Sequence, residues 1–155
     1  MLRHLLAFLL VLSLPAAIAG APDPALPGRI TEAALDAQGR CYRLIHHDTF
    51  AYEACLTGLL AEEKKAGPRR LGIEYFGFVG ALNSARLGML GAQDTAWVFL
   101  QRFRATQRKL RIDDASLCAT VPGDCEVRIA RMKLMEKSPP PPRQPHDLPD
   151  DGHRH

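Results

Sequence analysis

Four cysteines carry the clearest chemistry in this chain of 155 residues. Cysteine thiolates bind zinc or form disulfides, and structural zinc sites usually contain cysteines separated by about two to four residues. Here 13 residues separate the first two cysteines and 6 separate the last two, and no Cys-x-x-Cys redox motif is present. An even number of widely spaced cysteines is typical of disulfides in an oxidising compartment. We therefore predict two disulfides among Cys41, Cys55, Cys118 and Cys125.

Two predicted turns favour one of the three pairings that four cysteines allow. If one helix ends and the next begins near Asp48, then Cys41 and Cys55 each lie seven residues from the corner. Seven residues are about two helical turns, so both side chains return to the same face of a helical hairpin. Cys118 and Cys125 flank a Pro-Gly turn dipeptide. The prediction is therefore Cys41–Cys55 and Cys118–Cys125.

Histidines offer the next candidate chemistry, in the run His46-His47-Asp48 and in the C-terminal tail. Adjacent histidines on a helix point about 100° apart, so they rarely bind one metal ion together, even with Glu53 nearby. We expect Asp48 to cap a helix and the two histidines to lie at the surface. The tail histidines would bind a transition metal only unselectively; they are His146, His153 and His155. No metal site and no cofactor are predicted.

Motifs for catalysis are absent from the sequence. There is no Gly-x-Ser-x-Gly, no phosphate-binding loop and no paired-carboxylate motif, and the acidic pairs Glu62-Glu63 and Asp113-Asp114 are adjacent, where carboxylates usually face solvent on different sides. Nucleophilic catalysis needs a nucleophile beside a base, and His46 and His47 are the only histidines of the expected folded part. We expect a protein that is not an enzyme, with a small hydrolase or metal-binding protein as an alternative.

Basic residues gather in the second half of the chain. Residues 69–137 contain 12 basic and 7 acidic residues, against 5 and 7 in residues 20–68, and the whole chain has a formal net charge of +3. This mild charge disfavours nucleic acid and leaves a protein or an envelope component as the partner. The candidate contacts to an anion or partner are Arg69, Arg70, Arg86, Arg102, Arg104, Arg108, Lys109 and Arg111. The alternative is a solvated charged face.

The two ends of the chain are expected to lie outside the fold. Residues 1–19 have a basic start, an apolar run and an Ala-x-Ala site, the pattern of a secretory signal peptide cleaved after Ala19 or, as a second choice, after Ala21. The apolar run is shorter than the roughly 20 residues of a membrane span, although an uncleaved anchor is the alternative. We expect an exported, periplasmic or secreted protein without a transmembrane anchor after cleavage. Residues 20–28 are expected to be flexible, and residues 138–155 to be a disordered tail rich in proline and histidine.

The remaining residues, 29–137, are predicted to form one all-α domain. The spacing of apolar residues predicts helices over about 31–46, 49–66, 70–90, 93–110 and 125–137, with Thr31, Asp48 and Asp124 as caps and Asp113 or Asp114 capping a short turn. The fold class is a small helical bundle of four main helices and a short one, stabilised by the two disulfides.

The helix over 70–90 has an unusual stripe of small residues. Gly77, Ala81, Ser84 and Gly88 recur at spacings of four, three and four. Such a stripe lets another backbone approach closely, and we predict the central buried helix of a bundle. Two alternatives are a membrane span, which Glu74 disfavours, and a groove that the glycines leave for a ligand.

Taken together, these patterns predict an exported, non-enzymatic helical protein that binds a partner protein or a cell-envelope component. One alternative is a periplasmic inhibitor or immunity-type protein that blocks a secreted enzyme or toxin. A periplasmic chaperone is a further alternative, and it would expose apolar surface.

Overall fold

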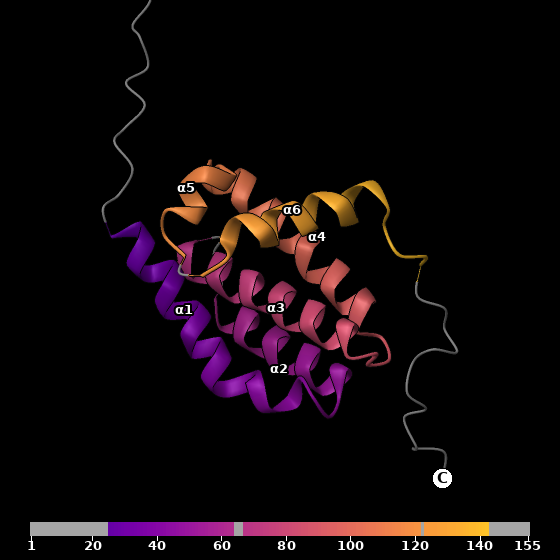
Figure 1. Ribbon diagram of the computed structural model, residues 1–155. Coiled ribbons are helices and arrows are strands. Elements are labelled where there is room, and N and C mark those ends of the chain that lie inside the picture. Colours follow the sequence, from indigo (N-terminus) through magenta and orange to yellow (C-terminus); the bar gives the residue numbers. More distant parts are fainter. Residues whose placement is uncertain (1–24, 64–66, 122, 143–155) are drawn as a thin grey trace, which may run out of the picture.

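The computed structural model describes residues 25–63, 67–121 and 123–142, and these residues form a small all-α fold, as predicted. The helices are α1 (Leu26–Cys41), the 3₁₀ turn η1 (Tyr42–Leu44), α2 (Thr49–Glu62), α3 (Pro68–Arg86), α4 (Ala92–Leu110), α5 (Asp114–Cys118) and α6 (Cys125–Lys137). Figure 1 shows α3 in the middle of the molecule, with α1 along its left side, α2 below it and α5 and α6 above it in this view. The predicted signal peptide, residues 1–19, and tail residues 143–155 lie outside the described residues.

Helix α1 begins five residues earlier than the sequence predicts. It starts at Leu26 with a proline in its first turn, so residues 26–28 of the segment expected to be flexible belong to the helix. A proline is tolerated there because the first helical N–H groups have no partner within the helix. The predicted cap Thr31 lies inside α1, and its hydroxyl donates to the backbone carbonyl of Thr120 at 3.0 Å. This bond ties α1 to the segment that precedes α6.

The corner between α1 and α2 has the predicted cap and disulfide, but α1 ends at Cys41 instead of about His46, and the 3₁₀ turn η1 leads from there towards Asp48. The carboxylate of Asp48 accepts hydrogen bonds from the backbone N–H groups of Phe50 and Ala51, at 2.9 and 3.1 Å, and so caps α2. The disulfide Cys41–Cys55 joins the two helices with its Cα atoms 5.9 Å apart, which confirms the predicted pair. It fixes the end of α1 against α2.

Three glycines let α3 pack closely against three different helices. A Cβ atom on Gly72 would collide with the backbone of α1, and one on Gly80 would collide with the hydroxyl of Tyr52 in α2. A Cβ atom on Gly77 would lie 2.5 Å from the ring of Phe99 in α4. These approaches explain why α3 is buried on nearly all sides and confirm it as the central helix. Within the described residues, none of the helices combines the length and hydropathy that a membrane span requires.

The end of the small-residue stripe differs from the prediction. Helix α3 ends at Arg86, and Gly88 lies beyond it, exposed, with a φ of +74° and open space within 4 Å of the place that a Cβ atom would take. The N–H groups of Gly88 and Met89 donate to the carbonyls of Ala85 and Ser84, which is the hydrogen-bond pattern of a Schellman C-cap. Gly88 therefore ends the helix instead of extending the packed stripe.

The second disulfide closes the connection between α5 and α6. Asp113 caps α5 by accepting a hydrogen bond from the N–H of Ser116 at 2.7 Å. The bond Cys118–Cys125 joins the two helices with Cα atoms 5.3 Å apart, as predicted. The two disulfides together indicate an oxidising, extracytoplasmic environment.

Helix α6 packs on the outside of the bundle. Asp124 lies at its N-cap position, as predicted, although its side chain accepts no hydrogen bond from the first turn. Of the five predicted apolar positions only Ile129 and Met132 are buried. The others are exposed: Val127, Ala130 and Leu134. One face of α6 therefore covers the bundle, and apolar side chains remain on the other.

Candidate functional site

Two of the eight basic residues predicted to contact an anion or partner are held in ion pairs between helices. Arg69 lies 2.8 Å from Glu63 and also pairs with acidic residues of α1. Arg104 lies 2.6 Å from Asp114 and 2.8 Å from Glu136, joining α4 to α5 and α6. These arginines are bound to carboxylates of the fold itself.

The ion pair with Arg104 lowers the pKa of Asp114. Burial acts to raise the pKa of Asp114, but hydrogen bonds from Gln107 and Arg104 and the charge of Arg104 outweigh burial and hold the pKa below its usual value. The carboxylate is thus charged in the folded protein, where it accepts from Gln107 Nε2 at 2.9 Å. The ion pairs of Arg104 with Asp114 and Glu136 therefore stabilise the attachment of α5 and α6 to the bundle.

A third predicted residue, Arg70, pairs with a carboxylate inside the core. Its Nε donates to Glu74 Oε1 at 3.0 Å, and its NH1 donates to the backbone carbonyls of Leu60 and Glu63, at 3.4 and 3.2 Å. Glu74 is only 1% exposed, and its Oε2 has no hydrogen-bond partner among the described residues. Burial raises the pKa of Glu74, and the opposing effects of Thr106 and Arg70 are smaller. Arg70 therefore links the end of α2 to α3.

The other predicted basic residues are spread over the molecule. Arg102 donates to Thr57 Oγ1 at 3.4 Å, and its guanidinium lies 5.6 Å from the centre of the Phe99 ring. Arg86 lies 16 residues after Arg70 on the same helix, about 24 Å away at 1.5 Å per residue, so the eight residues do not form one patch. At the end of α4 lie Arg108, Lys109 and Arg111. Their contact with an anion or partner stays a prediction.

The histidine run has a local structural role at the corner that Asp48 caps. The ring of His46 packs edge-on against the ring of Tyr42, with centroids 5.5 Å apart. Among the described residues, no three His, Cys, Asp or Glu side chains are grouped closely enough to hold a metal ion. The tail histidines lie outside the described part of the chain.

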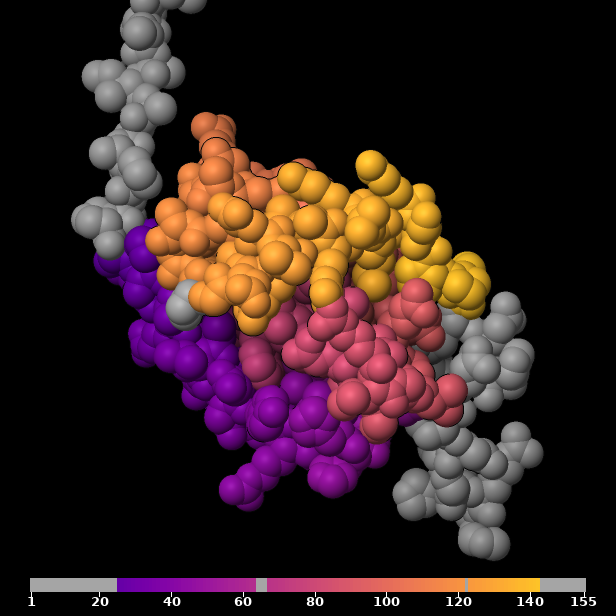
Figure 2. Space-filling view, viewed as in Figure 1, coloured from indigo at the N-terminus to yellow at the C-terminus, as the bar shows by residue number. Residues whose placement is uncertain are grey.

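A concave surface lies between α1, α3 and the start of α6, and none of the eight predicted basic residues lines it. We call it the α1–α3 groove, and it consists of two neighbouring hollows. The first has a volume of about 180 Å³ and is lined mainly by apolar side chains, among them Leu35, Tyr75, Phe76, Val79 and Val121. Figure 2 shows α1 and α6 on either side of a narrow strip of α3.

The second hollow continues the groove towards the corner between α1 and α2. It has a volume of about 210 Å³ and a more polar lining, which includes Tyr42, His46 and Asn83. Four residues line both hollows and so make them one surface: Gln38, Phe76, Val79 and Arg128. An apolar hollow therefore adjoins a polar one.

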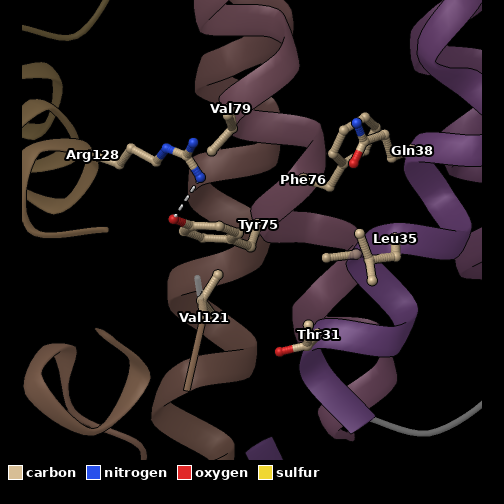
Figure 3. A pocket seen from close by; sticks show the side chains of 9 residues that line it. Thr31, Leu35, Gln38, Tyr75, Phe76, Val79, Val121 and Arg128 are labelled. Atoms are coloured by element: carbon tan, nitrogen blue, oxygen red, sulfur yellow. Dashed lines mark hydrogen bonds between the residues drawn. The ribbon is translucent and has the colours of Figure 1, made fainter. Parts of the chain in front are cut away.

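Arg128 of α6 forms one wall of both hollows, and its position is held by Tyr75. The NH1 group donates to the Tyr75 hydroxyl at 3.3 Å, and the guanidinium lies 5.9 Å from the centre of the Tyr75 ring. Tyr75 is 2% exposed and so gives a rigid support. Figure 3 shows Arg128 reaching from α6 towards Tyr75, with Leu35 and Gln38 of α1 on the opposite side.

Both disulfides support the walls of the groove. Cys41–Cys55 fixes the end of α1, directly before Tyr42 of the second hollow. Cys118–Cys125 closes the short segment that contains Val121 and ends three residues before Arg128. The hydrogen bond from Thr31 to the segment before α6 joins the two walls directly.

The sequence contains little that would have identified this groove. Arg128 is one of several basic residues in α6, and no local pattern distinguishes it from Arg131. The place of its guanidinium in the groove depends on a hydrogen bond to Tyr75, which is 53 positions away in the chain. The one useful signal is the position of Arg128 in the first turn of α6, three residues after a disulfide-closed segment.

No family model matches this chain, and no curated protein or solved structure is significantly similar to it.

Proposed function

We propose that this chain is an exported, non-enzymatic protein that binds a partner protein in the α1–α3 groove. The observation that carries the proposal is the exposure of large apolar side chains around an apolar floor. Leu35 is 59% exposed and Tyr42 is 47% exposed, beside a floor formed by Phe76 and Val79. Apolar side chains gathered around a concave surface with a polar rim are typical of interaction sites.

The size of the hollows supports a protein partner rather than a small molecule. Sites for small molecules usually have volumes of about 300–1,000 Å³ and bury most of the ligand. Each hollow by itself is smaller than this, at about 180 and about 210 Å³, and both open to solvent, so neither would bury most of such a ligand. A partner protein needs to insert only one or two anchor side chains into such hollows, because a few buried anchors supply most of the binding energy.

The polar groups of the groove support binding rather than catalysis. The hydroxyl of Thr31 donates to the carbonyl of Thr120, and the hydroxyl of Tyr75 accepts from Arg128. Within the described part of the chain, neither hydroxyl is hydrogen-bonded to a base that would activate it as a nucleophile. The signal-peptide pattern and the two disulfides support a place of action outside the cytoplasm.

Capture from an envelope extract tests the proposal. The chain without residues 1–19 is immobilised in its oxidised form, and bound proteins are quantified for the wild type and for Leu35→Glu, which places a charge at the groove. We expect this variant to lose a specifically captured protein by about tenfold or more. The matched control is Leu134→Glu, since Leu134 is also exposed, at 64%, but lines neither hollow. Equal capture by wild type and Leu35→Glu would overturn the proposal.

A further inference from the structure

The lining of the α1–α3 groove contains a cation and no carboxylate. Among the described residues that line the two hollows, none is Asp or Glu, whereas Arg128 contributes to both. The nearby acidic residues of α1, Glu32 and Asp36, pair with Arg69 instead. The groove is therefore complementary in charge to an anionic group.

Arg128 also differs from the arginines that hold the fold together. Arg69, Arg70 and Arg104 each pair with a carboxylate of this chain. No ion pair within the described residues involves Arg128, whose hydrogen bond goes to the Tyr75 hydroxyl and not to a carboxylate. A guanidinium binds a carboxylate through two parallel hydrogen bonds, and an arginine already held in place loses little freedom when it does so.

The second hollow offers groups that suit a peptide backbone. Gln38 and Asn83 each carry an amide, which donates and accepts hydrogen bonds as a peptide group does. In an extended peptide, residues i and i+2 point to the same side and lie about 7 Å apart. The two hollows adjoin and share four lining residues, so two such side chains of one segment can occupy them together.

Resting on the proposed function above, we propose that the partner presents an extended segment with a large apolar residue at position i and an acidic residue at position i+2. The apolar side chain enters the first hollow, between Leu35 and Val121. The acidic side chain pairs with Arg128, and the amides of Gln38 and Asn83 bind the backbone between the two side chains. The positive charge of Arg128 favours a segment with an acidic side chain over an uncharged one. The apolar first hollow, next to the more polar second hollow, favours a large apolar side chain beside the acidic one.

Selection from a random 12-residue peptide library displayed on phage tests the inference with the oxidised chain lacking residues 1–19. We expect enriched peptides to share a large apolar residue followed two positions later by Asp or Glu. Binding of one selected peptide is then measured by fluorescence polarisation, and replacing its acidic residue by the corresponding amide should weaken binding about tenfold. Failure to enrich peptides, or enrichment without an acidic residue, would overturn the inference.

Substitutions in α6 test whether Arg128 causes the preference for an acidic residue in the peptide. Arg128→Gln should bind the acidic peptide and its amide analogue equally, because the charge that distinguishes them is gone. Arg131→Gln on the same helix is the matched control and should keep the tenfold preference, and melting temperatures confirm that both variants fold. A preference that persists in Arg128→Gln would overturn the assignment to Arg128. If Leu35→Glu abolishes envelope capture but selected peptides show no acidic preference, the proposed function stands and only this inference fails.

The chain's own C-terminal tail is an alternative occupant of the groove. The same fluorescence polarisation measurement distinguishes it from a partner segment. Leu148-Pro149-Asp150 has the expected apolar and acidic spacing. If the groove takes a partner segment, replacing Leu148 by Ser and Asp150 by Asn should leave the affinity for the selected peptide unchanged. A tenfold gain in affinity would show that the tail competes for the groove, and would overturn the assignment to a partner.

Discussion

The guanidinium of Arg128 donates a hydrogen bond to the hydroxyl of Tyr75 at 3.3 Å, although 53 positions separate the two residues in the chain. Tyr75 lies in the central helix α3 and is almost fully buried, while Arg128 lies on the outer helix α6. The core thus determines where a surface charge is placed. This contact makes the α1–α3 groove a cationic site as well as an apolar one.

Tyr75→Phe should reduce binding of an acidic peptide while changing stability only slightly. The variant keeps the ring that lies beneath Arg128 but removes the acceptor, so the guanidinium loses its orientation. Loss of one partly buried hydrogen bond should lower the free energy of unfolding by about 0.5–1.5 kcal/mol. Urea denaturation and fluorescence polarisation measure the two effects. Unchanged peptide affinity would show that the hydroxyl does not position Arg128.

Two glycine-to-alanine substitutions should have opposite effects on stability. Gly77→Ala places a Cβ atom 2.5 Å from the Phe99 ring and should destabilise the fold by about 1–3 kcal/mol. Gly58→Ala in the exposed face of α2 meets nothing within 4 Å and should stabilise by about 0.5–1 kcal/mol, because alanine favours the helix. Chemical denaturation checks both. A neutral Gly77→Ala would mean that α3 and α4 can move apart at little cost.

The left-handed residue that ends α4 offers a stabilising substitution. Arg111 has a φ of +54°, and it is the only non-glycine residue with a positive φ in the described part of the chain. Arg111→Gly should raise the free energy of unfolding by about 0.5–1 kcal/mol, since glycine adopts this conformation without steric cost. The converse substitution, Gly88→Ala, should lower it by a similar amount. Thermal unfolding of both variants tests this pair, and a destabilised Arg111→Gly would contradict it.

The buried Glu74 should make stability depend on pH. Its pKa is raised in the fold by burial, so the folded protein retains the proton at a pH where the unfolded chain loses it. The wild type should therefore lose stability as the pH rises from the ordinary value of 4.5 through the raised pKa of the folded state. Glu74→Gln lacks this loss, so its advantage over the wild type should grow across that window. Denaturation at several pH values measures the difference, and a constant difference would contradict the prediction.

The predicted signal peptide can be tested directly by mass spectrometry. When the full chain is expressed in a bacterium, we expect the product in the envelope fraction to begin at Gly20, after cleavage behind Ala19. Replacing Ala17 and Ala19 by bulky residues should block processing, because signal peptidase requires small residues at these positions. An envelope product with an intact leader would favour the anchor alternative.

Several elements of the fold could be predicted from the sequence because short-range physics specifies them. Asp48 caps α2 through backbone groups two and three residues away. The pair Cys41–Cys55 was predicted correctly, although helical periodicity holds only on the α2 side of that cap, because α1 ends at Cys41 and a 3₁₀ turn follows it. The predicted start and end of α1 and the predicted ends of α2 and α3 were wrong by a few residues. A proline in the first turn, a 3₁₀ turn and a glycine C-cap have weaker local signals than an Asp N-cap.

Periodicity, caps and turns act over a few residues, and for that reason the amino-acid sequence was enough to specify the helical class, the disulfide pairs and several helix boundaries. The availability of charged residues for binding, in contrast, depends on the packed fold. Packing paired Arg69 and Arg104 with carboxylates of other helices, and it placed Arg128 over Tyr75 beside an apolar groove. Ion pairs and concave surfaces form where helices meet, and those meetings join residues that are far apart in the sequence.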